Sequence, residues 1–418
     1  MDCDRTGGRK DVAVQGRLLG LALVLVAALC CACTPTHLDQ VTTSAISTRE
    51  PQHTFLQDAA VTYGLDVNPA NPTIGLARVP QVLQLVQRAG ASAVRTGGNW
   101  ATEEPSPGHY DFSEVDQLFS LAKADGLTVL FELGKEPTWD APGGNTNAPP
   151  SDCDAPSASC ASVRQYVTAL VDHAAPEGLR YLIVRNEPQD FNMNWVGGDA
   201  ASYAHFQNVV YQAAHAADPV IKVFNGGTEA VTPSLVQNLA PQAALDAKAI
   251  AFATALYSDP SWCNSLDILD LHVGDLGPVW SPQIVDASER AIQACNGGRP
   301  IPVWVTEVGY PSTPVLQASP VYTKELGDRY QGGEAGQARF LTDTFRALAH
   351  DDNVVGINWT FTVDPNLIQA PPPGTNDETV FDDGFGDGLV YSSYETKASY
   401  QAFQLIAAEG GRPARSRG

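Results

Sequence analysis

The sequence of residues 180–188 is Arg-Tyr-Leu-Ile-Val-Arg-Asn-Glu-Pro, and that of residues 303–307 is Val-Trp-Val-Thr-Glu. Both stretches are rich in apolar and β-branched residues, which is typical of a buried strand. Each then ends near a carboxylate, Glu187 in the first and Glu307 in the second. Packing explains such a carboxylate poorly, because it would face inward at the end of a strand. The two stretches therefore predict buried strands with a functional site at their ends.

Strand-like runs alternate with Ala-rich helical patterns from about residue 60 onward. The predicted strands are 62–66, 92–96, 128–133, 180–185, 222–225, 268–272, 303–306 and 356–360. The predicted helices are 79–89, 115–124, 163–174, 203–216, 284–294 and 335–349, where apolar residues recur at helical spacing. Eight strands that alternate with helices predict an α/β fold, a (β/α)8 TIM barrel in a single domain. A doubly wound sheet is less favoured, because no Gly-x-Gly-x-x-Gly or P-loop motif follows any of these strands.

Two long loops rich in Pro and Gly follow the third and the eighth predicted strands, at 142–159 and 364–388. In a (β/α)8 barrel both loops would emerge on the C-terminal face, where loops carry function. We expect the barrel to span residues 59–408 and residues 409–418 to form a flexible tail.

The N-terminus has the order of a secretory signal. Four basic residues precede an apolar run at 18–29, which is too short for a comfortable membrane span. The Leu-Cys-Cys-Ala-Cys stretch at 29–33 is similar to a bacterial lipoprotein signal, in which a small residue precedes the lipidated cysteine. We therefore expect a signal peptide over 1–33, a lipid anchor on Cys33 and a surface tether over 34–58, with plain cleavage and release as the alternative. The expected location is extracytoplasmic, either secreted or anchored to the bacterial cell surface.

The composition limits the partners. The chain has 418 residues, with 25 Lys and Arg against 47 Asp and Glu, and a formal net charge of −22. A hydrophobic share of 44% allows a large core and excludes intrinsic disorder. The acidity argues against binding nucleic acid or anionic lipid, since both need clustered Lys and Arg. Contact with a membrane is thus expected only through the anchor on Cys33.

Four cysteines follow the signal region, Cys153, Cys160, Cys263 and Cys295. In an exported chain they predict two disulfides, for which three connectivities are possible. Proximity in the sequence favours Cys153–Cys160 and Cys263–Cys295. No pair has Cys-x-x-Cys spacing, no histidine accompanies them, and no His-Glu-x-x-His motif is present, so we expect no metal site.

Barrel geometry predicts that the two strand-end glutamates approach each other. Strands about 4.8 Å apart and tilted by about 36° give a barrel about 15 Å across. The strands of Glu187 and Glu307 are three apart in the ring, which places their carboxyls roughly 4 to 6 Å apart. Carboxyls about 5 Å apart suit hydrolysis of a glycosidic bond with retention, whereas inversion needs about 6.5 to 9.5 Å.

Several motifs resemble those of the clan A glycoside hydrolases, a group of retaining (β/α)8 enzymes that includes cellulases and β-xylosidases. The matching residues lie at the strand positions typical of that clan. They are the Asn-Glu-Pro at 186–188, Glu307, Arg95 on the second strand and Trp359 on the eighth. The segments 100–112 and 126–130 are similar to its family 39 and family 42 members. The resemblance covers roughly residues 60–405, which is nearly the whole predicted barrel.

The resemblance implies a role for each residue. Glu307 would be the nucleophile that forms a covalent glycosyl-enzyme intermediate, and Glu187 would be the acid/base. Arg95 would keep Glu307 ionised, and Asn186 would hydrogen-bond the sugar 2-hydroxyl. The implied enzyme cleaves a β-linked oligo- or polysaccharide without a cofactor. An inverting or transglycosylating enzyme would need the same carboxylates with a different gap or acceptor site.

One position departs from the clan pattern. After the sixth strand the clan has a His followed two residues later by a Tyr that supports the nucleophile, whereas this chain has His272-Val-Gly-Asp275. His272 keeps a site role by its place at a strand end, with a packed core histidine as the alternative. Tyr310 or Asp275 could replace the missing hydroxyl. The gap also motivates a competing hypothesis, a surface glycan-binding barrel that has lost hydrolysis.

Tryptophans follow strand ends on the predicted active face, and flat aromatic rings suit the apolar faces of sugars. They are Trp100, Trp139, Trp195, Trp280 and Trp359. We expect Trp100, Trp139 and Trp359 to bind substrate, with loop packing as the alternative for each. Trp304 lies an odd number of positions from Glu307, so strand alternation predicts that it faces the helices.

Overall fold

The computed structural model of the chain describes residues 60–67, 74–190, 194–229, 247–364 and 386–410. The predicted signal peptide, lipid anchor and tether lie outside the described residues, as do residues 365–385 of the second long loop and 411–418 of the tail.

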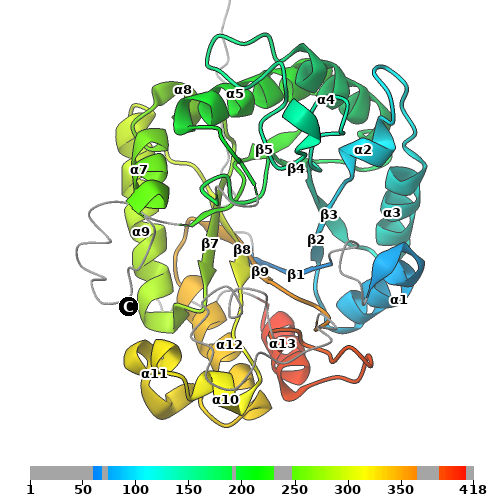
Figure 1. Cartoon of the computed structure of the whole chain (residues 1–418). Coiled ribbons are helices and arrows are strands. Elements are labelled where there is room, and N and C mark those ends of the chain that lie inside the picture. The colour runs from blue at the N-terminus through cyan, green and yellow to red at the C-terminus, as the bar shows by residue number, and fades with distance from the viewer. Residues whose placement is uncertain (1–59, 68–73, 191–193, 230–246, 365–385, 411–418) are drawn as a thin grey trace, which may run out of the picture. The chain divides into compact units, whose positions relative to one another are not determined.

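All the strands are parallel and lie at the centre of the fold, with the helices around them (Figure 1). Their order is β5-β4-β3-β2-β1-β9-β8-β7-β6. The strands are β1 (Thr62–Asp66), β2 (Ala93–Gly97), β3 (Thr128–Glu132), β4 (Tyr181–Ile183), β5 (Lys222–Phe224), β6 (Thr228–Glu229), β7 (Leu269–Gly274), β8 (Val303–Val308) and β9 (Val354–Trp359). The eight predicted strands are all present, with ends that shift by at most two residues.

The ring of strands closes at the fifth strand, which is interrupted into β5 and β6. Phe224 at the end of β5 forms a parallel bridge with Ile268, just before β7, and β6 pairs with β7 further along. Between them, the Asn225 side chain takes the place of a backbone ladder. Its Nδ2 donates to the Asp270 carbonyl at 2.9 Å, and its Oδ1 accepts from the Asp270 amide at 2.7 Å. The predicted (β/α)8 barrel is therefore confirmed.

The helices cover the outside of the barrel (Figure 1). They are α1 (Gly75–Arg88), α2 (Trp100–Glu103), α3 (Ser113–Ala124), α4 (Ala161–Ala174), α5 (Ala200–Ala217), α7 (Ala247–Leu256), α8 (Pro260–Cys263), α9 (Gly277–Cys295), α10 (Pro314–Gln317), α11 (Pro320–Leu326), α12 (Glu334–Leu348) and α13 (Ala398–Ala408). The six predicted helices correspond to α1, α3, α4, α5, α9 and α12. Helix α5 begins with a capping box, in which Asp199 and Ser202 each bond the other's backbone amide.

Trp304 lies inside the barrel, so the prediction that it faces the helices is wrong. Its ring packs with Leu130 and Phe224 in the inner core, and its Nε1 donates to Asn358 at 2.9 Å. The cause is a bulge in β8. Leu271 pairs with Val305 and the next residue of β7 pairs with Glu307, which leaves Thr306 as an extra residue. The bulge shifts the alternation by one position and lets Trp304 and Glu307 both point inward.

Two disulfides join Cys153 to Cys160 and Cys263 to Cys295, so the favoured pairing is confirmed. The first closes a turn within the long loop after β3, and the second ties α8 to the end of α9.

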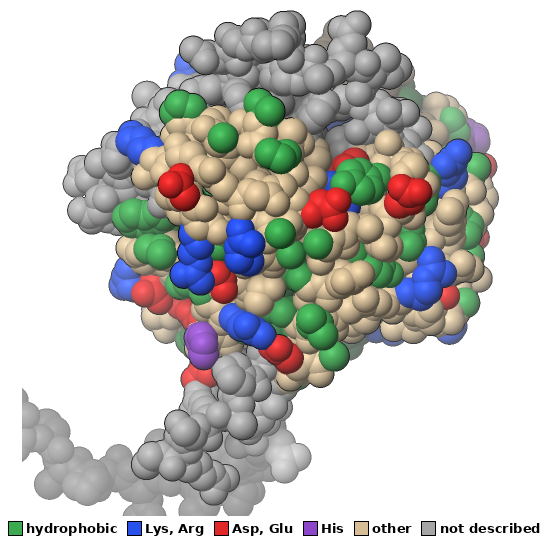
Figure 2. Space-filling view, turned by 90° about the horizontal axis from the view of Figure 1, so that it is seen from below, with side chains coloured by type: hydrophobic (Ala, Val, Ile, Leu, Met, Phe, Trp, Pro, Cys, Tyr) green, Lys and Arg blue, Asp and Glu red, His purple; other side chains and the backbone are tan. Residues whose placement is uncertain are grey.

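The surface mixes charged, polar and small apolar groups. Figure 2 shows the side below the view of Figure 1, where acidic and basic side chains are interspersed with hydrophobic ones. Within the described ranges, no helix combines the length and apolarity that crossing a bilayer requires.

Candidate active site

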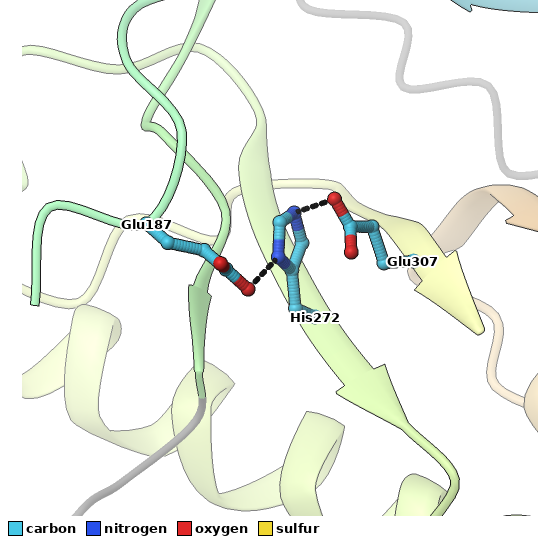
Figure 3. A group of neighbouring side chains, drawn as sticks. All are labelled: Glu187, His272 and Glu307. Carbon is cyan, nitrogen blue, oxygen red and sulfur yellow. Dashed lines mark hydrogen bonds and ion pairs between the residues drawn. The ribbon is translucent and has the colours of Figure 1, made fainter. Parts of the chain in front are cut away.

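Glu187, His272 and Glu307 meet at the C-terminal ends of the strands (Figure 3). His272 lies between the two carboxylates. Its Nδ1 is 2.7 Å from Oε1 of Glu187, and its Nε2 is 3.4 Å from Oε1 of Glu307. One oxygen of each glutamate and one ring nitrogen lie within 4.8 Å of one another. The distance between the Glu187 and Glu307 carboxylate oxygens therefore agrees with the carboxyl spacing expected from strand geometry.

The backbone at Glu187 is held in an unusual conformation. Its φ is +39°, in the left-handed region that non-glycine residues rarely adopt outside functional sites. The Glu187 amide donates to the carbonyl of Gly226 at 2.6 Å. The next residue, Gly227, has φ +55°, and a Cβ added there would overlap the His272 ring. The Gly-Gly pair that interrupts the fifth strand thus allows its backbone to approach both Glu187 and His272 closely.

Arg95 connects the nucleophile candidate to the strand ends on the other side of the barrel. Its Nη1 bonds Glu307 and also Asp66, the latter at 2.9 Å. Its Nη2 bonds Glu132 at 2.8 Å and Asn186 Oδ1 at 2.6 Å. The Arg95 side chain is only 7% exposed, against 20% for Glu307, so the guanidinium lies beneath the carboxylate. Such charge-assisted bonds fix the orientation of Glu307.

The charges of this cluster perturb one another. Burial alone would raise the pKa of Glu307, but His272 and Arg95 bring it below its usual value. Burial disfavours charge on His272, yet the carboxylates of Glu307 and Glu187 raise its pKa to about 9. Burial raises the pKa of Asp66 to about 8 against the opposing influence of Arg95. The site therefore keeps Glu307 ionised and His272 protonated at neutral pH.

Glu187, His272 and Glu307 could in principle hold a divalent ion, since each offers a ligand atom. His272 would first have to lose a proton that its two carboxylate neighbours stabilise. The guanidinium of Arg95, bonded to Glu307, would also repel a second cation. The arrangement suits proton transfer better than metal binding.

Tyr310 packs against other aromatic rings, whereas support of the nucleophile would require a contact with Glu307. Its ring stacks on Phe340 at 4.4 Å and meets Tyr322 edge-on at 5.2 Å. Burial raises the pKa of both tyrosines, and the charge of the neighbouring Asp275 raises it further. Among the described residues, Arg95 hydrogen-bonds Glu307 and His272 faces it at ion-pair distance, and no bond links it to Tyr310. His272 is therefore the ring that lies beside the candidate nucleophile, with its Nε2 3.4 Å from Oε1 of Glu307.

The predicted substrate tryptophans pack within the protein. Trp100 is 2% exposed and stacks on Tyr166 at 4.5 Å, and Trp359 is fully buried, with its Nε1 donating to the Asp387 carbonyl at 2.6 Å. Trp139 is half-buried, and its ring meets Trp100 edge-on at 6.3 Å. Sugar binding by these three rings stays a prediction.

Three site carboxylates were not foreseen. Asp66 ends β1 and Glu132 ends β3, and both bond Arg95. The rule that singled out Glu187, a carboxylate at the end of an apolar strand, would have found both. Asp270 lies two residues before His272 on β7 and accepts a bond from Thr306, and burial raises its pKa to about 6. Strand alternation places it on the same inward face as His272.

Solved structures share this fold. A family 39 glycoside hydrolase from Bacteroides cellulosilyticus WH2 is 18% identical with a TM-score of 0.57, covering 85% of this chain and 64% of that protein. A family 39 β-xylosidase from Caulobacter crescentus is 20% identical with a TM-score of 0.55, covering 84% of this chain and 72% of that one. A GH5_18 protein from Streptomyces cattleya, solved with Manβ1-4GlcNAc, is 16% identical with a TM-score of 0.57, covering 86% and 81%.

These similarities confirm a barrel like those of clan A glycoside hydrolases, and at 14–20% identity the likeness is one of fold. The chain spans less than two thirds of the length of the Bacteroides enzyme. No protein-family model matches the sequence, and no curated protein matches it.

Proposed function

We propose that the protein is a retaining glycoside hydrolase that cleaves a β-linked oligo- or polysaccharide. The observation that carries the proposal is the pair of carboxylates, Glu187 and Glu307, within 4.8 Å of each other at the C-terminal end of the barrel. This gap leaves room for attack on the anomeric carbon by one carboxylate and is short for an intervening water, which inversion would need. The clan-like fold gives the proposal independent support.

In the first step the Glu307 carboxylate attacks the anomeric carbon and the glycosidic C–O bond breaks. The leaving oxygen takes a proton from the Glu187–His272 pair, whose facing atoms are 2.7 Å apart. Glu307 becomes an ester and loses its charge, which removes the strongest influence that raises the pKa of His272. In the second step Glu187 takes a proton from water, the hydroxide attacks the anomeric carbon, and Glu307 is released.

The fold neighbours support a choice of first substrates to test. The neighbouring structures include a β-xylosidase, an exo-β-1,4-mannosidase and a complex with Manβ1-4GlcNAc. A suitable first panel is therefore the 4-nitrophenyl β-D-xyloside, β-D-mannoside and β-D-glucoside, together with β-linked oligosaccharides. The two disulfides fit the oxidising, extracytoplasmic location expected for an exported lipoprotein.

A mechanism-based trap tests the nucleophile. A 2-deoxy-2-fluoro β-glycoside with an activated leaving group should add one fluoroglycosyl unit to the protein, and peptide mapping should place the label on Glu307. Glu307→Gln should abolish both labelling and turnover, whereas Glu177→Gln, a change at an exposed residue, should leave both unchanged. Undiminished turnover by Glu307→Gln would contradict the proposal.

The competing function is a barrel that binds surface glycans without cleaving them, and the absent strand-six tyrosine motivates it. Calorimetric binding of a β-linked oligosaccharide, with no reducing sugar released from any member of the panel, would favour this function over hydrolysis.

A further inference from the structure

A buried ion pair involves Arg185, which lies two residues before the acid/base candidate Glu187 in the chain. Arg185 and Glu136 have side chains that are 3% and 1% exposed, and Arg185 Nη1 lies 2.5 and 2.6 Å from the two Glu136 oxygens. Neither side chain bonds Glu187. The pair is thus a buried charge pair that the proposed chemistry does not itself use.

Arg185 also joins two loops of the C-terminal face. Its Nε and Nη2 donate to the Asn194 carbonyl, at 3.0 and 2.6 Å, in the loop after β4. Nη2 also donates to the Thr146 carbonyl at 3.4 Å, in the loop after β3. The guanidinium lies 5.7 Å from the centre of the Trp195 ring. One side chain therefore fixes the segment 185–187 relative to both loops.

The main chain of Arg185 is fixed on its other side by the interrupted fifth strand. A Cβ at Gly226 would overlap the Arg185 carbonyl oxygen, so the two backbones are in close contact. The Gly226 carbonyl accepts the amide of Glu187 at 2.6 Å, and Glu187 itself has φ +39°. A left-handed backbone at a glutamate is strained and persists only where its surroundings hold it. The Arg185 side chain and Gly226 together supply such a hold.

We propose that Arg185, paired with Glu136, is the positioning residue that holds Glu187 in its left-handed conformation and so aims its carboxyl at the leaving oxygen and at His272. This inference rests on the proposed function, because it assigns to Arg185 the orientation of the acid/base. It goes further by predicting that loss of the pair impairs proton transfer selectively and leaves nucleophilic attack by Glu307 intact.

The dependence of the rate on the leaving group separates an effect on proton transfer from an effect on nucleophilic attack. A phenyl β-glycoside needs a proton on its departing oxygen, whereas a 2,4-dinitrophenyl β-glycoside departs without one. The kcat/KM value for each reports the first step of the reaction. Loss of general acid catalysis costs about 10²- to 10⁴-fold on the poor leaving group and little on the good one. A general loss of folded protein lowers both values by the same factor.

The test compares variants on phenyl and 2,4-dinitrophenyl glycosides of the sugar that the wild type cleaves fastest. Glu187→Ala removes the acid/base and so shows the full selective loss of kcat/KM on the phenyl glycoside. The double variant Arg185→Met, Glu136→Leu removes both buried charges and leaves neither unpaired, which favours folding. It should lower kcat/KM for the phenyl glycoside at least about tenfold more than for the dinitrophenyl glycoside. Arg185→Lys keeps the charge without the two-pronged contact and should fall in between.

A second buried ion pair serves as the matched control. Lys397 and Asp364, with side chains 0% and 14% exposed, lie 2.7 Å apart and bond no residue of the segment 185–187. Lys397→Met, Asp364→Leu should lower both kcat/KM values by one common factor.

Equal losses on both glycosides in the Arg185 and Glu136 double variant would overturn the inference while leaving the proposed function standing, provided that Glu187→Ala shows the selective loss. If the wild type cleaves neither glycoside, or if Glu187→Ala loses both equally, the proposed function fails and this inference fails with it.

Discussion

Nδ1 of His272 lies 2.7 Å from Oε1 of Glu187, while the other ring nitrogen faces Glu307. One imidazole therefore touches both carboxylates that the proposed reaction needs. Because the two negative neighbours favour the imidazolium, the charge on the ring depends on both carboxylates.

His272 should make stability fall at alkaline pH. Its pKa is raised from 6.5 to about 9 in the folded protein, so its contribution is fully present below pH 6.5 and is lost as the pH rises through 9. The side chain is buried, and the shift corresponds to about 3 kcal/mol at most. Urea unfolding between pH 6 and pH 10 should show a steeper loss for the wild type than for His272→Gln. The exposed His109→Gln should follow the wild type, and parallel curves for wild type and His272→Gln would refute the assignment.

Arg95 should control the acidic limb of the pH profile. It lowers the pKa of Glu307 together with His272, so Arg95→Met should raise that pKa and move the acidic limb of kcat/KM to higher pH. The variant also leaves Asp66 and Glu132 without their shared cation, and we expect a loss of about 3–5 kcal/mol in the free energy of unfolding. Arg164→Met, at an exposed position on α4, should change neither quantity.

Gly227 should be far less tolerant of alanine than another glycine with a similar backbone. At Gly143, where φ is +61° and a Cβ would meet open space, alanine should cost about 1–2 kcal/mol and leave kcat unchanged. At Gly227 alanine pays the same backbone cost and also displaces the His272 ring, so kcat should fall by about tenfold or more. Thermal unfolding and steady-state kinetics of the two variants would check this, and equal kinetics would argue against a close approach to His272.

The two disulfides should differ in their contribution to stability. Loop-closure entropy gives about 4 kcal/mol for Cys263–Cys295, whose cysteines are 32 residues apart, and about 2 kcal/mol for Cys153–Cys160, which are 7 apart. Replacing each pair by alanine and measuring urea unfolding should reproduce this order. The opposite order would mean that the loop after β3 is held mainly by its disulfide.

The barrel was predictable because its strands are short apolar runs between helical patterns, and the signal in each run is local. The interruption at Asn225 and the bulge at Thr306 were not predictable in this way. Both depend on the register between neighbouring strands, which period-two alternation within one strand does not contain. The bulge alone reversed the expected direction of Trp304.

The polar part of the site followed from position, since parallel strand ends converge on one edge of a barrel. Arg95, Glu187, His272 and Glu307 accordingly meet. The aromatic part did not follow, because a ring at a strand end can turn toward solvent or pack inward. Tyr310 packs against Phe340, a choice made by tertiary contacts that the sequence pattern does not express.

At the break between β5 and β6, the closure of the strand ring depends on the side chain of Asn225. Both bonds that the Asn225 amide makes to Asp270 would be lost by a single side-chain rotation, whereas a continuous ladder must lose several backbone bonds together. Local opening of the ring should therefore begin here. In native-state hydrogen exchange, the amide of Asp270, whose acceptor is Asn225 Oδ1, would be the first of the barrel's interior amides to exchange.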